Sequence, residues 1–203
     1  MHENLKTIPI FMLEYNMENI YSEFEWRGLF YQQSNPDGIK KLLGSGTQSI
    51  YAGFDPTAES LHVGHLVPLI ALRRLQLGGH SPIALVGGAT GLIGDPSGKS
   101  DERSLNTLDI VADWSSRIKS QLERFIDFSS GKYQAKLLNN YSWIGNMSAI
   151  EYLRELGKHF TINWMVAKDS VRSRMESDTG ISYTEFSYID RKSTRLNSSH
   201  VSQ

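Results

Sequence analysis

Two histidines stand where an apolar segment gives way to a helical pattern. The stretch Tyr51–His65 reads YAGFDPTAESLHVGH and ends in His62-Val63-Gly64-His65. A helix N-terminus offers unpaired N–H groups and the positive end of the helix dipole, which suit phosphate. Gly64 lets a flat base or ribose approach the backbone, and donating imidazoles stabilise charge where pyrophosphate leaves. The pattern predicts nucleotide chemistry, with an ordinary helix cap and two surface histidines as the alternative.

A glycine-rich segment is the second feature. Residues 87–100 read GGATGLIGDPSGKS and follow a short apolar run, which is where α/β sheets place their ligands. The segment lacks the GxG start of the dinucleotide fingerprint. Gly94 and Gly98 have three residues between them, where a Walker P-loop needs four. We expect a loop whose backbone cradles phosphate, and the alternative is a mobile surface loop.

Single side chains near these segments suit particular ligand groups. Tyr51, on an expected strand, can hydrogen-bond a substrate hydroxyl, and Asp95, in the glycine-rich segment, can hold a cationic amine. Lys99 and Arg103 lie on or beside that segment and can fold over a polyphosphate. The alternative for Tyr51 is a core tyrosine whose hydroxyl bonds another protein group. The alternative for Asp95 is a turn in which its side chain bonds the backbone, directly before Pro96. No metal site is expected, since the two histidines have no evident third ligand.

The elements that must position these residues alternate between strand and helix. We expect strands at 49–54, 82–86 and 135–138. Expected helices are 17–33, 37–43 (capped by Asp37), 65–77, 106–128, 148–156, 160–177 and 184–189. In the helix 65–77, Pro68 is expected in the first turn and Ile70 on the buried side. This alternation predicts an α/β fold with a Rossmann-like parallel sheet flanked by helices.

Composition sets the broad class of the protein. Of 203 residues, 39% are hydrophobic and 21% charged, which is typical of a globular chain with a real core. The formal charge of -1 means that the chain has no net basic excess that would point to nucleic acid. It does not exclude a local basic patch. Cysteine is absent from the sequence, which excludes disulfides and thiolate metal sites.

The two ends of the chain differ from its middle. The N-terminus resembles neither a secretory signal nor a transit peptide, and no apolar run is long enough to span a bilayer, so we expect a cytoplasmic protein without membrane contact. Residues 1–16 are expected to form an extension and residues 17–190 a partial Rossmann-like catalytic domain. The polar, serine-rich segment 191–203 is expected to be disordered and non-native.

Three blocks in order carry a resemblance to a known family. They read YAGFDPTAESLHVGH, IALVGGATGLIGDPSGKSDER and GISYTEFSY. Together they resemble bacterial-type tyrosyl-tRNA synthetases, which are class I aminoacyl-tRNA synthetases, and HVGH is similar to the HIGH signature of that class. The resemblance runs from about Trp26 to Tyr188 and implies a chain that is an N-terminal catalytic fragment.

The resemblance implies residues that bind tyrosine. Tyr51 matches the strand residue whose hydroxyl meets the phenol of the substrate. Asp95 and Tyr188 match the residues that hold its α-amino group. Ala52 stands where some relatives carry a polar or cysteine side chain near the ribose, so that contact is expected to be absent.

The resemblance also implies residues for ATP and for catalysis. The implied ATP-binding positions are Gly53, Asp55, His62, Gly64 and His65. The implied catalytic positions are Thr57, His62, His65, Lys99 and Arg103. Of these, Thr57 and His62 match the pair that stabilises the departing pyrophosphate, and Lys99 and Arg103 match cations of a mobile loop.

The implied reaction is attack of the tyrosine carboxylate on the α-phosphorus of ATP, followed by transfer of the tyrosyl group to tRNA(Tyr). ATP is a substrate that arrives with Mg²⁺, and no protein-bound metal is implied. The resemblance implies a homodimer, with the region Phe160–Ile181 near the interface. An ordinary buried helix is the alternative for that region.

The chain departs from the family after Tyr188. The helix that completes the amino-acid pocket, the ribose-binding loop, the KMSKS-type loop and the C-terminal RNA-binding modules have no counterpart in the sequence. We therefore expect the 203-residue chain to be inactive or nearly so in tyrosine-dependent pyrophosphate exchange. Another HxGH nucleotidyltransferase and a non-catalytic binding paralogue remain as alternative functions.

Overall fold

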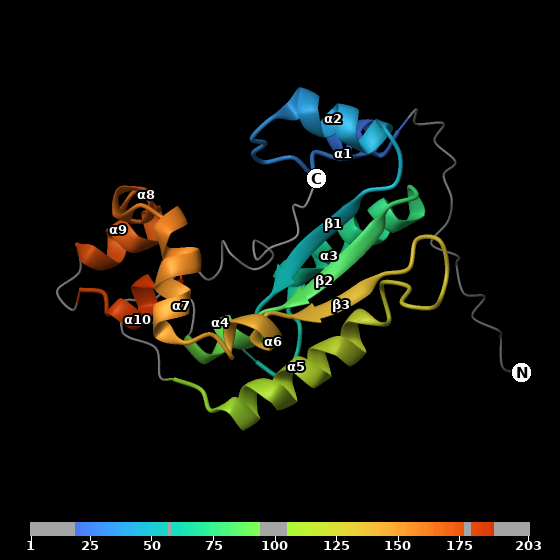
Figure 1. Ribbon diagram of the computed structural model, residues 1–203. Coiled ribbons are helices and arrows are strands. Elements are labelled where there is room, and N and C mark those ends of the chain that lie inside the picture. The colour runs from blue at the N-terminus through green and yellow to red at the C-terminus, as the bar shows by residue number, and fades with distance from the viewer. Residues whose placement is uncertain (1–18, 57, 94–104, 177–179, 189–203) are drawn as a thin grey trace, which may run out of the picture. The chain divides into compact units, whose positions relative to one another are not determined.

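The computed structural model describes residues 19–56, 58–93, 105–176 and 180–188 (Figure 1). These residues belong to two compact units, one ending at Gln48 and the other beginning at Ser49. The segments 1–16 and 191–203, predicted as an extension and a tail, lie outside the described residues. No helix in the described part of the chain is long and apolar enough to cross a membrane.

The first unit contains α1 (Ile20–Trp26) and α2 (Pro36–Gly44). Helix α1 is shorter than the predicted 17–33, because the chain turns at Gly28, whose φ is 65°. Two backbone bonds close this end: Gly28 N–H to the Glu25 carbonyl and Leu29 N–H to the Phe24 carbonyl, both 3.0 Å. This is the Schellman pattern, which favours glycine at its left-handed position.

Helix α2 begins one residue before the expected start. Asn35 caps it, since its Oδ1 accepts the Gly38 N–H at 2.9 Å, and Pro36 occupies the first helical position. The prediction of Asp37 as the cap is wrong. Asp37 instead lies in the first turn, where a carboxylate suits the helix dipole.

A three-stranded parallel sheet forms the centre of the second unit. Its strands are β1 (Ser49–Phe54), β2 (Ser81–Val86) and β3 (Lys136–Asn139), in the order β1-β2-β3. Phe54 pairs with Val86, and Val86 pairs with Asn139. The carboxyl ends of all three strands therefore reach the same edge. The predicted α/β class with a parallel sheet flanked by helices is confirmed.

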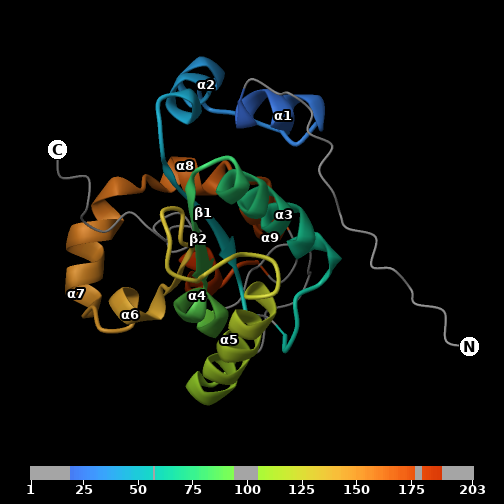
Figure 2. The ribbon, with the colours of Figure 1, turned by 90° about the vertical axis from the view of Figure 1, so that its right-hand side faces the viewer.

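Helices α3 (Val63–Leu77) and α5 (Leu108–Leu122) connect successive strands. Right-handed crossovers between neighbouring parallel strands place both helices on one face of the sheet (Figure 2). Gln76 of α3 joins them, because its amide bonds the backbone of Asp127 and Tyr133 beyond α5 at 2.7–3.0 Å. The core of this layer includes Phe54, Leu69, Leu72, Val86, Ile118 and Leu122.

Helix α3 differs from its prediction in two respects. It begins at Val63, so Pro68 is its sixth residue and not part of the first turn. Proline there removes one intrahelical hydrogen bond. Ile70, predicted on the buried side, is 49% exposed. Helix α5 also ends earlier than predicted, at Leu122 rather than near Phe128.

The glycine-rich segment is only partly a loop. Helix α4 (Gly88–Ile93) follows β2 directly, which contradicts the prediction of a loop over residues 87–100. Its first turn is closed by Gly91 N–H bonding the Gly87 carbonyl at 2.7 Å. A Cβ at Gly91 would lie 2.9 Å from the Pro56 ring, so glycine permits the close approach of α4 to the chain after β1. Residues 94–100 lie outside the described part.

Short helices complete the second unit. They are α6 (Tyr141–Ile144), α7 (Ala149–Glu151), the π-helix Tyr152–Leu156, the 3₁₀-helix Gly157–His159, α8 (Ile162–Val166), α9 (Asp169–Met175) and α10 (Tyr183–Phe186). The prediction for 148–156 holds, but 160–177 is broken because Lys168 is extended and begins α9. Helix α6 was not predicted. A second apolar cluster of Ile93, Met165, Val171 and Tyr188 joins α4 to α8–α10.

Candidate active site at the carboxyl edge of the sheet

Asp55 is the carboxylate on which three segments meet. It follows β1 and is half-buried. The Thr90 hydroxyl of α4 donates to its Oδ1 at 2.7 Å, and the Tyr188 hydroxyl, just beyond α10, donates to its Oδ2 in a short hydrogen bond. Hydrogen bonds to a carboxylate are roughly twice as strong as neutral ones. Asp55 therefore fixes α4 and Tyr188 relative to the end of β1.

Glycine after β2 makes this arrangement possible. The Gly87 N–H donates to the Phe54 carbonyl at 2.9 Å. A Cβ at this position would lie 2.1 Å from Asp55 Oδ1 and 2.3 Å from Thr90 Oγ1, which no side chain tolerates. At this position, glycine makes room for a protein carboxylate, a role that the sequence alone did not indicate.

Two asparagines, the last residue of β3 and the one after it, complete the edge. The Oδ1 of Asn140, a fully buried residue, accepts the Ala89 N–H at 2.7 Å and so satisfies a donor in the first turn of α4. Asn139 lies so close to Gly88 that a Cβ there would be 2.3 Å from its amide oxygen. Sequence reasoning missed this pair and Thr90. The signal that could have indicated the asparagines was a pair of polar residues directly after the apolar strand predicted at 135–138.

His62 and His65 cap α3 reciprocally. His62 Nδ1 accepts the Gly64 N–H at 3.1 Å, and His65 Nδ1 accepts the His62 N–H at 3.2 Å. The two rings lie 3.9 Å apart, and the His65 ring also packs near Phe54, with centroids 6.0 Å apart. Because both Nδ1 atoms are acceptors, each neutral ring carries its proton on Nε2. Both Nε2–H groups are thus assigned as donors.

The environment of His65 favours this neutral form. Burial lowers the pKa of His65 most, and nearby His62 lowers it further, while the Asp55 carboxylate raises it by a smaller amount. His65 is therefore neutral at pH 7, and the site offers an imidazole donor rather than a cation. Among the described residues no three His, Asp or Glu side chains gather as ligands for a metal ion.

The lowered pKa of His65 makes stability depend on pH. The folded chain binds fewer protons at His65 than the unfolded chain, so the free energy of unfolding rises with pH between the lowered pKa and about 6.5. The stabilisation is complete above that interval and is lost as the pH falls through the pKa of His65. We expect urea unfolding at about pH 5.5 to show a loss of about 1 kcal/mol relative to about pH 7.5, the usual worth of a cap.

His65→Asn is the matched variant for this effect, since asparagine keeps a side-chain acceptor that does not titrate. Burial also lowers the pKa of His80. The contribution of His80 to the pH dependence is therefore the same in the parent and in His65→Asn. A His65→Asn chain with the same pH profile as the parent would contradict this assignment.

Tyr51 and Gly53 lie on the other face of β1. Side chains alternate along a strand, and Phe54 faces α3, so these two positions face away from that helix. Tyr51 is 46% exposed, and Gly53 belongs to the same face. The predicted residues Thr57, Asp95, Lys99 and Arg103 lie outside the described residues. The structure thus joins Asp55 to Tyr188 and His62 to His65, with Tyr51 on the opposite strand face.

A buried ion pair supports the segment that delivers Tyr188. Arg174 of α9 and Glu185 of α10 lie 2.9 Å apart, with side chains only 4% and 2% exposed. Glu185 belongs to the GISYTEFSY block, but its pairing with Arg174 was not predicted. The pair fixes α10, from which Tyr188 reaches Asp55.

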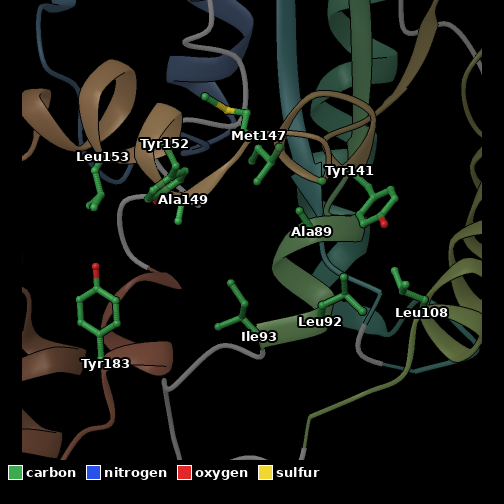
Figure 3. A pocket seen from close by; sticks show the side chains of 12 residues that line it. Ala89, Leu92, Ile93, Leu108, Tyr141, Met147, Ala149, Tyr152, Leu153 and Tyr183 are labelled. Atoms are coloured by element: carbon green, nitrogen blue, oxygen red, sulfur yellow. The ribbon is translucent and has the colours of Figure 1, made fainter.

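A separate apolar cavity of about 540 Å³ lies between α4, α6, α7 and α10 (Figure 3). Figure 3 shows Ile93 and Leu92 on one side of it, with Tyr152 and Tyr183 on another. Among the described residues that line it, none was predicted for the site. The cavity is therefore distinct from the Asp55 and histidine cluster.

A parallel sheet with a carboxylate, close-packed glycines and a histidine-capped helix at its carboxyl edge is typical of the α/β class, in which ligands bind at that edge. Residues 45–190 match the family described as tRNA synthetases class I (W and Y). The chain belongs to this family.

Individual relatives agree with that assignment. The chain is 58% identical over 173 residues to the tyrosine–tRNA ligase of Bacillus velezensis, covering 85% of this chain and 41% of that protein. It is 57% identical over 173 residues to tyrosine–tRNA ligase 1 of Bacillus subtilis, covering 85% and 40%. The chain thus spans about two fifths of the length of these relatives.

Among solved structures, a C-terminally truncated mitochondrial tyrosyl-tRNA synthetase of Aspergillus nidulans resembles the chain. The TM-score is 0.76 at 28% identity, over 89% of this chain and 54% of that one.

Proposed function

We propose that this chain supplies the tyrosine- and ATP-binding part of a tyrosine–tRNA ligase. The observation that carries the proposal is the reciprocal His62–His65 cap beside Asp55 at the carboxyl edge of the sheet. The names of the relatives favour tyrosine within a family that also serves tryptophan. Residues 17–190 then form part of a catalytic domain.

The proposed reaction begins with attack of the tyrosine carboxylate on the α-phosphorus of ATP. The bond from that phosphorus to the bridging oxygen breaks, pyrophosphate leaves and tyrosyl-adenylate forms. His62 and His65 present Nε2–H donors to the phosphates, and the exposed backbone at Gly64 admits the adenosine part. Such donors are set in place before the reaction and stabilise charge as it develops. Thr57, Lys99 and Arg103 are proposed to complete the phosphate contacts.

The proposed amino-acid site uses Tyr51, Asp95 and Tyr188. The proton of the Tyr188 hydroxyl is committed to Asp55. A hydroxyl whose proton is committed in this way offers only lone pairs to a ligand. That is the role required by an α-ammonium group, which has only donors. Tyr51 is proposed to bond the substrate phenol, and Gly53 is proposed to contact ATP.

Further parts of the proposal concern partners. ATP is proposed to bind with Mg²⁺, and the tyrosyl group is proposed to pass to tRNA(Tyr) in the cytoplasm. A homodimer is proposed to involve the region 160–181, where Ile162, Trp164 and Met175 are 63%, 41% and 53% exposed. Apolar surface of this kind is common at interfaces between subunits.

A chimera tests the proposed function, since the chain spans only part of its relatives. Residues 26–188 of this chain would replace the matching residues of the Bacillus subtilis relative. We expect ATP–pyrophosphate exchange that requires tyrosine and is not supported by phenylalanine or tryptophan. His65→Ala in the chimera should reduce exchange on the order of tenfold to a thousandfold. A folded chimera without exchange, or one driven by another amino acid, would contradict the proposal.

A further inference from the structure

The segment between β1 and α3 leads into the histidine pair, and its described residues, 55–56 and 58–62, belong to no helix or strand. Residues 58–60 form bends, and α3 begins only at Val63. Backbone N–H and C=O groups in such a segment need partners outside it. Asp55 is held by Thr90 and Tyr188 at one end. The partners at the other end determine how the chain enters His62.

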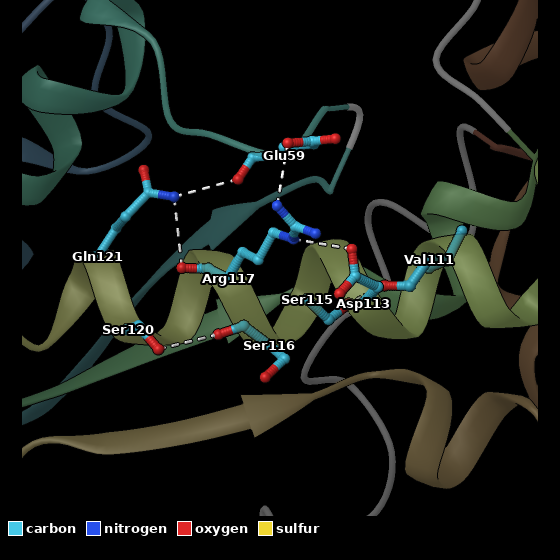
Figure 4. A network of polar contacts seen from close by, with 8 residues as sticks. All are labelled: Glu59, Val111, Asp113, Ser115, Ser116, Arg117, Ser120 and Gln121. Atoms are coloured by element: carbon cyan, nitrogen blue, oxygen red, sulfur yellow. Dashed lines mark hydrogen bonds and ion pairs between the residues drawn. The ribbon is translucent and has the colours of Figure 1, made fainter.

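Those partners come from one side chain of α5. Gln121 Oε1 accepts the Leu61 N–H at 2.9 Å. Gln121 Nε2 donates to the Glu59 carbonyl at 3.1 Å (Figure 4). The amide thus bonds two backbone groups on either side of Ser60, as a neighbouring strand would. The second Nε2 hydrogen goes to the Arg117 carbonyl at 3.3 Å. Only an amide side chain supplies an acceptor and donors in one such fork.

The anchor itself is rigid. Gln121 lies in the last turn of α5, directly before Leu122, which is fully buried, and one turn after Ile118, which is 1% exposed. The parallel contact between Arg117 and Glu59, at 3.0 Å, joins side chains that are 51% and 67% exposed. Exposed ion pairs of this kind contribute little. Gln121 therefore dominates the attachment of this segment to α5.

We propose that Gln121 is a positioning residue that sets the entry of the chain into His62 and so fixes the His62–His65 pair. Leu61, whose N–H it holds, is the residue immediately before the cap. A shift of Leu61 turns the His62 backbone, and with it both the His62 N–H that His65 accepts and the ring that accepts the Gly64 N–H. Displacements of about 1 Å at such a place cost on the order of a hundredfold in rate. The catalytic meaning of this inference rests on the proposed function.

Nuclear magnetic resonance on the ligand-free 203-residue chain tests the inference. Gln121→Met removes both backbone bonds at nearly constant volume. We expect the Gly64 amide to lose hydrogen-exchange protection about tenfold and the imidazole ¹⁵N signals of His62 and His65 to show mixed tautomers. Gln121→Glu keeps the acceptor for Leu61 but loses the donors to the Glu59 and Arg117 carbonyls, so it should recover only part of the Gly64 protection. Arg117→Met, the matched control, should leave both signals within about twofold of the parent.

Two results would overturn the inference. One is Gly64 protection and histidine tautomers that are unchanged in Gln121→Met. The other is an equal loss of protection at the Leu122 amide, which would mean that Gln121 only stabilises α5.

A binding measurement on the same variants separates this inference from the proposed function. Gln121→Met should weaken ATP binding on the order of tenfold while leaving tyrosine binding unchanged. Equal losses for both ligands, or no loss for either, would overturn the positioning role. A parent chain that binds neither ligand would count against the proposed function, and the histidine signals would still decide the role of Gln121.

Discussion

Arg174→Met is expected to lower the free energy of unfolding by about 3–5 kcal/mol, the usual cost of leaving one member of a buried ion pair without its partner. Glu185 is 2% exposed, and its second carboxylate oxygen, Oε1, has no hydrogen-bond partner among the described residues. Removing the guanidinium at 2.9 Å leaves that charge in an apolar setting. Urea unfolding followed by circular dichroism measures the loss, which we expect to appear first in α8–α10.

The double variant Arg174→Met/Glu185→Met decides whether charge is the cause. Replacing both members of a buried pair by apolar residues is often neutral or stabilising, so the double variant should recover most of the lost stability. Lys158→Met is the matched control, because it breaks an exposed pair with Glu155 and should cost less than about 1 kcal/mol. A double variant as unstable as Arg174→Met would show that the packing of Arg174, and not its charge, was lost.

Asp55→Ala is expected to cost about 2–3 kcal/mol and to weaken tyrosine binding at least tenfold. Hydrogen bonds to charged groups are worth about 1.5–3 kcal/mol. Thr90 can turn its hydroxyl to the Gly87 carbonyl, 3.0 Å away, and recover part of its loss. Tyr188, which is 1% exposed, loses the bond that orients its hydroxyl. Urea unfolding and calorimetric titration with tyrosine measure the two effects.

Two comparisons make this prediction specific. Tyr188→Phe should reproduce most of the tyrosine-binding defect, and combining it with Asp55→Ala should add little, because both changes remove the same hydrogen bond. Asp113→Ala removes an exposed carboxylate paired with Arg117 and should leave both measurements nearly unchanged. Fully additive losses in the double variant would show that Asp55 and Tyr188 act independently.

The strands and the histidine-capped helix could be predicted because their signals are local. Apolar runs bounded by polar or glycine residues marked β1 and β2 to within one residue. The His62-Val63-Gly64-His65 spacing indicated a helix close by, although α3 begins at Val63, two residues before the predicted start, with His62 as its cap. In each case the residues that decide the structure are neighbours in the sequence.

Helix α4 could not be predicted because its stability comes from elsewhere in the chain. Its sequence, GATGLI, contains two glycines and has low intrinsic helix propensity. Burial of Ile93 and a hydrogen bond from Ala89 to Asn140, 51 positions later, outweigh that propensity. Intrinsic helix propensity alone therefore predicts a loop for residues 88–93.

The polar contacts of the candidate site were missed for the same reason. Tyr188 and Asp55 are 133 positions apart, and Gln121 lies 60 positions from Leu61. The resemblance to a family pointed to Asp55 and Tyr188 as separate ligand contacts, but not to their direct bond. Pairings at such separations depend on how the helices return to the sheet edge, which no local pattern encodes.

Binding of a non-hydrolysable tyrosyl-adenylate analogue, followed residue by residue through backbone amide chemical shifts, tests the central claim most directly. We expect saturable shifts at Tyr51, Gly53, Asp55, Gly64 and His65 when the 203-residue chain is titrated with the tyrosyl sulfamoyl analogue. The phenylalanyl analogue should bind at least tenfold more weakly, since a site that hydrogen-bonds the phenol leaves polar groups unpaired. Shifts confined to the apolar cavity around Ile93 and Tyr152, or equal binding of both analogues, would contradict a tyrosine and ATP site at the carboxyl edge of the sheet.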